Sequence, residues 1–450
     1  MFQLPEEIKN IFYIFKKNNF EIYLVGGAVR DFLLRKTPEN FDFTTNATPE
    51  QIQSLFPNSF YHNIYGTVSI PLEKYIVEIT PFRKESDYSD FRHPKNINWA
   101  KTLDEDLSRR DFTINAIAYD GEKIIDPFEG QIDIKNQLIR CVGDPDKRFN
   151  EDALRLLRAI RFASQLGFFI EEKTREAIEK NNQLITKISW ERIRDEFLKI
   201  LKSDHPAEGV LFLKNTNILK YILPELDSCF LIHQKSPKRH HIYDVGTHLI
   251  MSLKNCQSKD AITRFATLIH DIGKEKTFKK DEKTGLITFY NHEVVGKKLA
   301  KKIAERFKLS NEQKEKLIRL VAYHQFTVSE LQTDKAIRRF IRNIGKEYLK
   351  DILDLRIADR LGSGAKPTSW RLELFKKRLI KVQKQPFKIT DLKVNGDDVM
   401  RILDIKTGPK VGRVLKYLFN LIIEKKLENK RTILLEEIKK IKDLVLELHQ

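Results

Sequence analysis

Two short segments near the N-terminus carry side chains that could hold a metal ion. Asn40 and Asp42 lie two residues apart in NFDFTT, whose β-branched and aromatic residues predict a strand. On a strand, this spacing points both side chains to one face. Glu78 lies in a second predicted strand, YIVEITPFR, which could pair alongside. Nucleotidyl transfer needs carboxylates in such positions to hold Mg²⁺ on the attacking hydroxyl and on the triphosphate. Of Asn40 and Asp42, only Asp42 is charged, so the candidate catalytic set lacks one carboxylate.

A glycine pair precedes these carboxylates and is suited to bind phosphate. Gly26 and Gly27 separate the apolar run EIYLV from a helical pattern. Paired glycines let backbone N–H groups approach a phosphate closely, and the start of a helix adds a favourable dipole. Arg30 could then clamp the phosphate oxygens. A tight structural turn explains the glycines equally well by themselves, and the carboxylates that follow favour the phosphate loop.

A third set of charged residues has the spacing of a base-reading surface. The run 151–167 predicts one helix, on which Asp152 and Arg155 share a face that Arg158 and Arg161 continue. Asp accepts and Arg donates hydrogen bonds, which matches the amino donor and ring-nitrogen acceptor of cytosine and adenine. Uracil and guanine present the opposite order and would leave both groups unpaired, which is strongly disfavoured. The alternative is a surface helix of ion pairs.

The middle of the chain carries metal-ligand residue types. A His-Asp pair, joined by a distant His and Asp, can coordinate a divalent transition metal that activates water on a phosphoester. The candidate ligands are His248, His270, Asp271 and Asp359. His292 and His324 lie between them and are candidates for a second metal, although a lone histidine is more often structural.

The elements that must position these residues change along the chain. Strand and helix signals mix in residues 1–145, and helical periodicity dominates from there on. We therefore expect an α+β protein with a small mixed β-sheet head at 1–145. A helical neck at 146–235, a His-bearing helical domain at 236–365 and a basic helical tail at 366–450 would follow.

Composition restricts the partners and the compartment. The 450 residues include 81 Lys and Arg against 63 Asp and Glu, a net charge of +18, which favours nucleic acid as a partner or reflects solvated lysine-rich helices. Three widely spaced cysteines fit a reducing cytoplasm and predict neither disulfides nor a cysteine-based zinc site. The N-terminus does not have the pattern of a signal peptide, and apolar runs stay shorter than a membrane span. We expect no membrane association and no obligate protein partner.

Ordered motifs along the chain resemble the class II tRNA nucleotidyltransferase and poly(A) polymerase family, whose members include CCA-adding enzymes. The resemblance spans nearly the whole chain. It is carried by GGAVRD at 26–31, the Phe-Asp motif with TTNATPEQI, RRDFTINA at 109–116, Asp126-Pro127, RFNED at 148–152 with Arg155, and SWERI at 189–193.

The family resemblance assigns expected roles to these residues. It implies a nucleotidyltransferase head with Mg²⁺ held at Asn40 and Asp42, and CTP and ATP as substrates. Asp152 and Arg155 would act as a protein template for C and A, and the tRNA acceptor and T-arm would be the partner. The expected nucleotide-binding residues are Gly27, Arg30, Arg109, Asp152, Arg155, Arg158 and Arg161.

Asn40 departs from the family pattern, which has an aspartate at this position. An Asn carbonyl can still ligate Mg²⁺ but brings no negative charge. Three interpretations remain open. The enzyme is naturally slow, Glu39 or Glu78 compensates, or the chain is an inactivated variant.

The later segments also resemble known modules. HDIGK at 270–274, with the distant His and Asp, resembles the HD phosphohydrolase superfamily and implies that His248, His270, Asp271 and Asp359 bind a metal. The polar stretch between Arg83 and Arg109 is similar to the loop that helps family members switch from C to A addition, with Asp90, Arg92 and His93 fitting that pattern. The tail from Pro386 resembles an RNA-binding segment. Basic residues that could contact tRNA phosphates are Lys376, Lys377, Arg378, Lys410 and Arg413.

The sequence leaves four functions to compare. The leading hypothesis is template-independent addition of CCA to tRNA 3′ ends. The alternatives are poly(A) polymerase, a metal-dependent phosphohydrolase with a degraded head, and a catalytically weakened tRNA-binding protein, the last motivated by Asn40.

Overall fold

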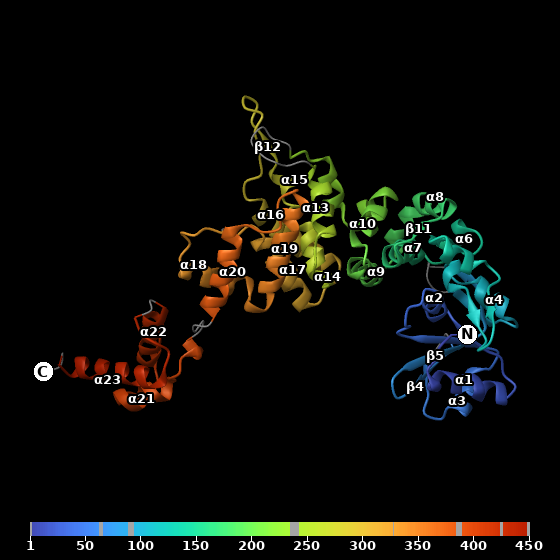
Figure 1. Cartoon of the computed structure of the whole chain (residues 1–450), viewed down its shortest axis with the longest axis horizontal. Coiled ribbons are helices and arrows are strands. Elements are labelled where there is room, and N and C mark those ends of the chain that lie inside the picture. The colour runs from blue at the N-terminus through green and yellow to red at the C-terminus, as the bar shows by residue number, and fades with distance from the viewer. Residues whose placement is uncertain are drawn as a thin grey trace.

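The head and the tail lie at opposite ends of a helical middle. The computed structural model describes residues 2–62, 66–88, 94–234, 243–326, 328–383, 389–423 and 426–447. Together they form an elongated, bent molecule (Figure 1). The head combines strands and helices and the rest is almost wholly helical, which confirms the predicted α+β class. The expected switching residues Asp90, Arg92 and His93 lie outside the described residues.

A seven-stranded mixed sheet organises the head. Its strand order is β3-β4-β5-β2-β1-β8-β9, and β2 and β5 form its parallel pair. The parallel register places Asp42 directly beside Glu78, and the antiparallel neighbour β1 places Val25 beside Asp42 on the other side. The bounds of the strands are β1 (Ile22–Val25), β2 (Phe41–Thr45), β3 (Phe60–His62), β4 (Thr67–Pro71), β5 (Ile76–Pro81), β8 (Ala118–Tyr119) and β9 (Ile124–Ile125).

Helices and one hairpin surround this sheet. Buried Ile8, Ile11 and Phe15 belong to the first helix and to the same core cluster as the sheet residues. Two further strands pair antiparallel as a separate hairpin. The elements are α1 (Glu6–Lys17), α2 (Gly27–Leu33), α3 (Pro49–Leu55), α4 (Leu103–Ser108), a 3-10 turn (Thr113–Asn115), α5 (Gly130–Lys135), β6 (Arg83–Tyr88) and β7 (Pro94–Trp99).

The neck corrects one expectation, because the run 151–167 is not one helix. Helix α6 (Pro145–Glu151) ends before Asp152, which has extended backbone angles, and α7 (Leu154–Leu166) begins after it. The Asp152 carboxylate accepts a hydrogen bond from the backbone N–H of Leu154 at 3.0 Å. Asp side chains compete in this way with helical hydrogen bonding. Gly167 ends α7 in the left-handed conformation. The remaining neck elements are β10 (Leu138–Ile139), β11 (Phe169–Ile170), α8 (Glu172–Asn181), a 3-10 helix (Asn182–Lys187), α9 (Trp190–Lys202), α10 (Pro206–Asn215), α11 (Leu219–Ile222), α12 (Pro224–Asp227) and a 3-10 helix (Ser228–Leu231).

The middle and the tail are helical, apart from a short hairpin. The middle contains α13 (Val245–Lys254), α14 (Ala261–Ile269), α15 (Lys274–Thr277), β12 (Lys279–Lys280), β13 (Ile287–Thr288), α16 (His292–Arg306), α17 (Asn311–Tyr323), α18 (Asp334–Ile344), a 3-10 turn (Lys346–Tyr348), α19 (Leu349–Gly362) and α20 (Trp370–Gln383). The tail contains a 3-10 turn (Ile389–Asp391), α21 (Gly396–Leu403), α22 (Pro409–Ile423) and α23 (Arg431–Glu447).

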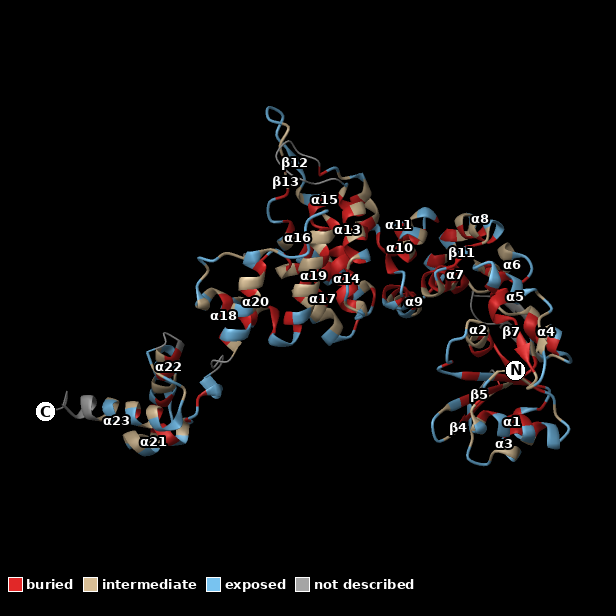
Figure 2. Ribbon diagram, in the orientation of Figure 1, coloured by how far each residue is buried: buried red, intermediate tan, exposed pale blue. Residues whose placement is uncertain are grey.

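The tail packs around a hydrophobic cluster that is separate from the large cluster shared by the other parts of the chain. One continuous cluster runs from the head through the neck and the middle to Val382, so α20 packs with the middle. Phe375 of α20 stacks on Phe326 with ring centroids 5.2 Å apart. The tail has its own cluster, which includes Val399 and Leu418. Figure 2 shows buried residues concentrated in the head, neck and middle, with fewer in the tail.

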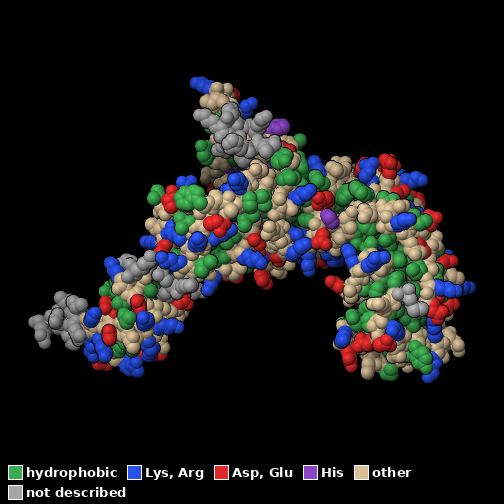
Figure 3. All heavy atoms as spheres, viewed as in Figure 1, with side chains coloured by type: hydrophobic (Ala, Val, Ile, Leu, Met, Phe, Trp, Pro, Cys, Tyr) green, Lys and Arg blue, Asp and Glu red, His purple; other side chains and the backbone are tan. Residues whose placement is uncertain are grey.

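Basic and acidic side chains are intermixed on the face of the molecule shown in Figure 3. On the face shown in Figure 3, Lys and Arg are spread over the head, middle and tail and alternate with acidic residues. Among the predicted tRNA contacts, Lys377, Lys410 and Arg413 are exposed, whereas Arg378 donates to Asp334 at 2.7 Å. No helix within the described ranges is long and apolar enough to cross a membrane.

Candidate active site and metal centre

A cavity of about 620 Å³ lies where the head sheet meets the neck. Eight arginines and four acidic residues contribute to its lining, so the cavity favours an anion. Nearly all the sequence-predicted head and neck residues line it. The lining residues are Val25, Gly26, Gly27, Arg30, Asp42, Phe43, Glu78, Thr80, Arg83, Arg109, Arg110, Asp111, Asn115, Asp152, Arg155, Arg158, Arg161, Phe162 and Arg192.

The glycine loop approaches the cavity as the phosphate-loop interpretation requires. Gly26 has φ +71°, in the left-handed region, and a Cβ there would come within 3.4 Å of a guanidinium nitrogen of Arg110. Gly27 starts α2, and Arg30 lies one turn later. Arg30 donates to Asn115 Oδ1 and to Asp31 Oδ1, both at 2.8 Å. The guanidinium is therefore held beside the loop before any ligand arrives.

The two carboxylates of the head sheet meet at the cavity. Asp42 and Glu78 are Cα partners on adjacent strands, and both line it. Burial raises the pKa of Asp42, the neighbouring Glu78 raises it further, and Arg110 opposes both effects. A cation between the two carboxylates would relieve this repulsion, so these residues fit a divalent ion. Asn40 lies before β2, is exposed, and is not among the residues that line the cavity.

A buried aspartate that the sequence interpretation missed fixes two cavity arginines. Asp106 is fully buried on α4. It accepts hydrogen bonds from Arg109 at 2.8 Å and 3.0 Å and from Arg110 at 3.1 Å. Asp106 also accepts from the backbone N–H of Arg83 at 3.3 Å, at the start of β6. The acidic residues in the first turn of α4 belong to no motif, so residue spacing alone did not identify this role of Asp106.

The predicted base-reading residues are held by partners from other helices. Asp152 pairs with Arg192 of α9 at 3.1 Å. Arg155, which is buried, donates to Glu151 at 2.8 Å and to the backbone carbonyl of Arg109 at 3.0 Å. Both side chains line the cavity, so the structure brings the predicted pair to one place. Arg192 falls in the quoted SWERI motif, but the motif alone assigned it no role.

The other two arginines of this face are paired across the fold. Arg158 donates to Asp111 at 2.7 Å, and Arg161 pairs with Glu196 of α9 at 2.6 Å. Burial opposes ionisation of Asp111, but the Arg158 and Arg155 guanidinium groups lower its pKa to about 2. Helix α9 therefore supports two lining residues, one through Arg192 and one through Glu196.

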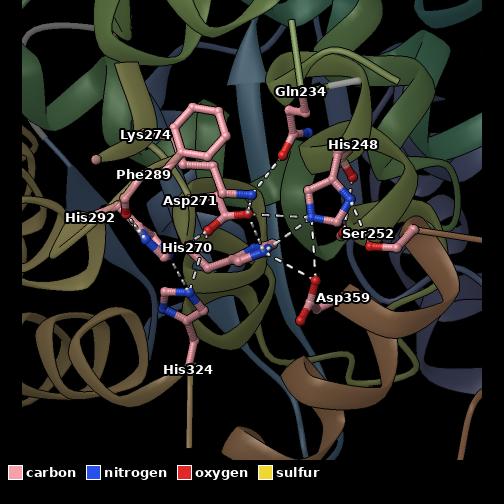
Figure 4. Close-up of polar contacts among 12 residues, drawn as sticks. Gln234, His248, Ser252, His270, Asp271, Lys274, Phe289, His292, His324 and Asp359 are labelled. Atoms are coloured by element: carbon pink, nitrogen blue, oxygen red, sulfur yellow. Dashed lines mark hydrogen bonds and ion pairs between the residues drawn. The ribbon is translucent and has the colours of Figure 1, made fainter. Parts of the chain in front are cut away.

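The predicted metal ligands of the middle domain converge from three helices (Figure 4). His248 lies on α13, His270 and Asp271 follow α14, and Asp359 lies on α19. His248 Nε2 lies 3.3 Å from His270 Nε2, 3.3 Å from Asp359 Oδ1 and 3.6 Å from Asp271 Oδ2. His292, which begins α16, completes a second side of the cluster with His324 at the end of α17.

A buried lysine belongs to the same cluster. Lys274 Nζ lies 2.6 Å from Asp271 Oδ2 and donates to Gln234 Oε1 at 2.6 Å. Both sides of the cluster face a cavity of about 490 Å³, whose rim includes Tyr290 and Asn291. A nitrogen-rich, buried donor set of this kind suits a divalent transition metal.

Three family models match successive parts of this chain. Residues 22–140 match the poly A polymerase head domain, and residues 167–230 match the probable RNA and SrmB-binding site of polymerase A. Residues 277–438 match a putative tRNA nucleotidyltransferase domain 2. Similar solved structures include that of the Bacillus stearothermophilus CCA-adding enzyme in complex with CTP, with 25% identity and a TM-score of 0.70. The match covers 99% of this chain and all of that one.

Curated relatives extend the agreement to the full length. The CCA-adding enzyme of Ligilactobacillus salivarius is 32% identical over 445 residues, which cover 97% of this chain and 98% of that enzyme. The enzyme of the same name from Lactobacillus helveticus is 49% identical over 201 residues, 44% of this chain and half of that enzyme's length. On the strength of the full-length match, this chain belongs to the family of CCA-adding enzymes.

Proposed function

We propose that this protein adds the sequence CCA to the 3′ end of tRNA, using CTP and ATP and no nucleic-acid template. The observation that carries this proposal is the single cavity that unites Asp42 and Glu78, the glycine loop, and the Asp152 and Arg155 side chains. Full-length relatives named CCA-adding enzymes support it. We propose the cytoplasm as the compartment, because the substrate tRNA is processed there.

The head residues divide the work of nucleotidyl transfer. Asp42 and Glu78 would hold Mg²⁺, with Asn40 contributing at most a neutral oxygen. The ion supplies charge stabilisation at the reacting phosphate and favours ionisation of the attacking tRNA hydroxyl. The glycine loop and Arg30 orient the triphosphate, while Arg109 and Arg110, fixed by Asp106, offset its charge.

The neck residues select the base. Asp152 accepts a hydrogen bond from the amino group of cytosine or adenine, and Arg155 donates to the adjacent ring nitrogen. Uracil and guanine would leave both protein groups without partners, which enzymes use to reject a wrong substrate strongly. Poly(A) polymerase remains the alternative within the family, and the incorporation of C separates the two activities.

Extension of a tRNA transcript that ends before CCA tests the proposal. Wild-type protein, Asn40→Asp and Asp42→Asn are each given labelled CTP, ATP and Mg²⁺, with Asp104→Asn on the exposed side of α4 as a matched control. We expect extension by wild type, at least equal extension by Asn40→Asp, and none by Asp42→Asn. Failure of wild type with recovery in Asn40→Asp would mean an inactivated chain. Failure of both would refute the transferase.

We propose a second activity, metal-dependent hydrolysis of a phosphoester, at His248, His270, Asp271 and Asp359. The specific observation is that these four side chains converge beside a cavity of about 490 Å³. Asp271 Oδ1 is buried without a hydrogen-bond partner, which supports a cation at the cluster. Hydrolysis of a cyclic phosphate by wild type but not by His270→Ala would support this activity. Equal metal content in both proteins would refute the ligand assignment.

A further inference from the structure

We propose that Phe162 is a positioning residue for the triphosphate of the bound nucleotide. Its ring holds the guanidinium groups of Arg30, Arg158 and Arg161 in one cluster where the head meets the neck. The inference rests on the nucleotidyl transfer proposed above and deepens it. Phe162 carries no charge and belongs to none of the motifs that point to that reaction.

Phe162 lies on α7, at the boundary between the neck and the head. The residue is buried, and it lines the cavity of about 620 Å³ that contains Asp42 and Glu78. From the head, Phe112 meets it edge to face, with ring centroids 5.7 Å apart. The Phe162 ring is therefore packed against the head and also borders the space in which the nucleotide would bind.

Three guanidinium groups lie over this one ring. Cζ of Arg161 lies 3.9 Å from the ring centroid, and Cζ of Arg30 and of Arg158 each lie 5.4 Å from it. Arg30 belongs to α2 of the head, whereas Arg158 and Arg161 belong to α7 of the neck. A cation within about 6 Å of the centroid is attracted to the face of an aromatic ring. The ring can therefore join the arginines of the two domains.

The carboxylates that pair with these arginines could not do so, because they lie on separate elements. Asp31 lies on α2, Asp111 lies between α4 and the 3-10 turn, and Glu196 lies on α9. By themselves, these ion pairs would draw the guanidinium groups in three directions. Among the described residues, Phe162 is the partner that all three arginines share.

An aromatic ring also suits this place better than another carboxylate would. A further negative charge in the cavity would repel the triphosphate and occupy N–H donors. The face of a ring attracts a cation through its quadrupole, adds no net charge and takes no hydrogen bond. The described bonds of Arg30 use Nε and one hydrogen on each of Nη1 and Nη2. One hydrogen on each Nη therefore remains for phosphate oxygens, which bind guanidinium groups strongly.

Burial makes such support necessary. The Arg30 and Arg161 side chains are only 12% and 11% exposed, so water screens the repulsion among the three positive charges poorly. Burial lowers the pKa of Arg161, Glu196 raises it, and the nearby Arg158 lowers it again. Contact with the ring face offsets part of this cost and keeps the arginines together before a nucleotide arrives.

Fluorinated phenylalanines at position 162 test the inference. Each added fluorine withdraws electron density from the ring face and changes its size little, so the cation–π attraction weakens while the packing stays. Full-length proteins with phenylalanine or its 4-fluoro, 3,5-difluoro or 3,4,5-trifluoro derivative are titrated calorimetrically with CTP, ATP and inorganic tripolyphosphate, with Mg²⁺ and without tRNA. We expect the Kd for all three ligands to rise stepwise, about tenfold across the series, with little change in melting temperature.

A natural substitution provides a second comparison. Phe162→Leu keeps an apolar side chain but removes the ring face, and it should raise the same Kd values about tenfold. Phe197→Leu is the matched control, because Phe197 is a fully buried neck residue that contacts Phe265 and Phe307 and does not line the cavity. It should lower the melting temperature and leave the Kd values unchanged.

The results separate this inference from the proposed function. A flat fluorine series would overturn the inference, even with weaker binding by Phe162→Leu, because Phe162 would then act through packing alone. Weakening for CTP and ATP but not for tripolyphosphate would also overturn it, because the ring would then act on the base or the sugar. A stepwise rise in a protein that does not extend tRNA would support the inference and refute the proposed transferase.

Discussion

Replacement of Arg192 by Ala should impair base selection without disturbing phosphate binding. Arg192 contacts Asp152 Oδ2 at 3.1 Å and Oδ1 at 3.3 Å. Without Arg192, the hydrogen bond that still holds the Asp152 carboxylate among the described residues comes from the backbone N–H of Leu154, at 3.0 Å. The side chain would then be free to turn away from the position in which it accepts from the base.

The size of the effect follows from the burial of this pair. The Arg192 and Asp152 side chains are 23% and 20% exposed, so solvent screens their interaction only in part. Hydrogen bonds to charged groups contribute about 1.5–3 kcal/mol in such positions. We therefore expect kcat/KM for CTP and ATP to fall about 10- to 100-fold, with little change for UTP and GTP. Discrimination should fall by the same factor.

Single-nucleotide incorporation with each of the four triphosphates measures this ratio. Arg194→Ala is the matched control, because Arg194 lies on the same helix but bonds to Asp195 and to the carbonyl of Lys308. The double variant with Asp152→Ala should lose little more than Asp152→Ala alone, since both changes remove one interaction. Unchanged discrimination in Arg192→Ala, or full additivity, would refute the argument.

Three further changes probe the sites. Burial disfavours the ionised form of Asp111, but Arg158 favours it, and the pKa falls from 3.8 to about 2. The ionised Asp111 therefore adds about 2 kcal/mol to the free energy of unfolding above pH 4, and this stabilisation is lost as the pH falls towards 2. Asp111→Asn should flatten the acid dependence of the denaturant midpoint over that range, and an unchanged profile would contradict the ion pair. Gly26→Ala should raise KM for CTP about tenfold or more, because a residue with a Cβ is strained at the positive φ of Gly26. A wild-type KM would contradict this role of the loop. Lys274→Met should bind Mn²⁺ more tightly, with a Kd about tenfold lower when measured by calorimetry, because the Lys274 ammonium lies 2.6 Å from Asp271 and repels a cation there. Weaker binding by this variant would show that the lysine instead organises the site.

Local pattern was enough to predict the residues that lie close together in sequence or on neighbouring strands. The glycine loop and the strands carrying Asp42 and Glu78 occur as predicted, because glycine freedom and β-branched composition act locally. The first of these strands begins at Phe41, however, so the prediction that Asn40 shares a strand face with Asp42 was wrong. The confirmed α+β class follows from the same change of periodicity after the head.

The supporting residues could not be predicted, because their partners are distant in sequence. Arg192 lies 40 residues from Asp152, and only tertiary packing of α9 on α7 brings them together. Asp152 itself illustrates how a side-chain hydrogen bond to the backbone interrupts a helical pattern. The metal-ligand roles of His248, His292 and His324 remain proposals, although the structure places all three in one cluster.

The most direct test is to sequence the 3′ ends made on a tRNA transcript that lacks CCA, in the presence of all four triphosphates and Mg²⁺. The protein should add C, C and A in that order and then stop. It should add neither U nor G, because Asp152 and Arg155 accept only cytosine and adenine. A run of A residues would indicate a poly(A) polymerase. Mixed additions that include U or G, or no addition by either wild type or Asn40→Asp, would contradict the proposed function.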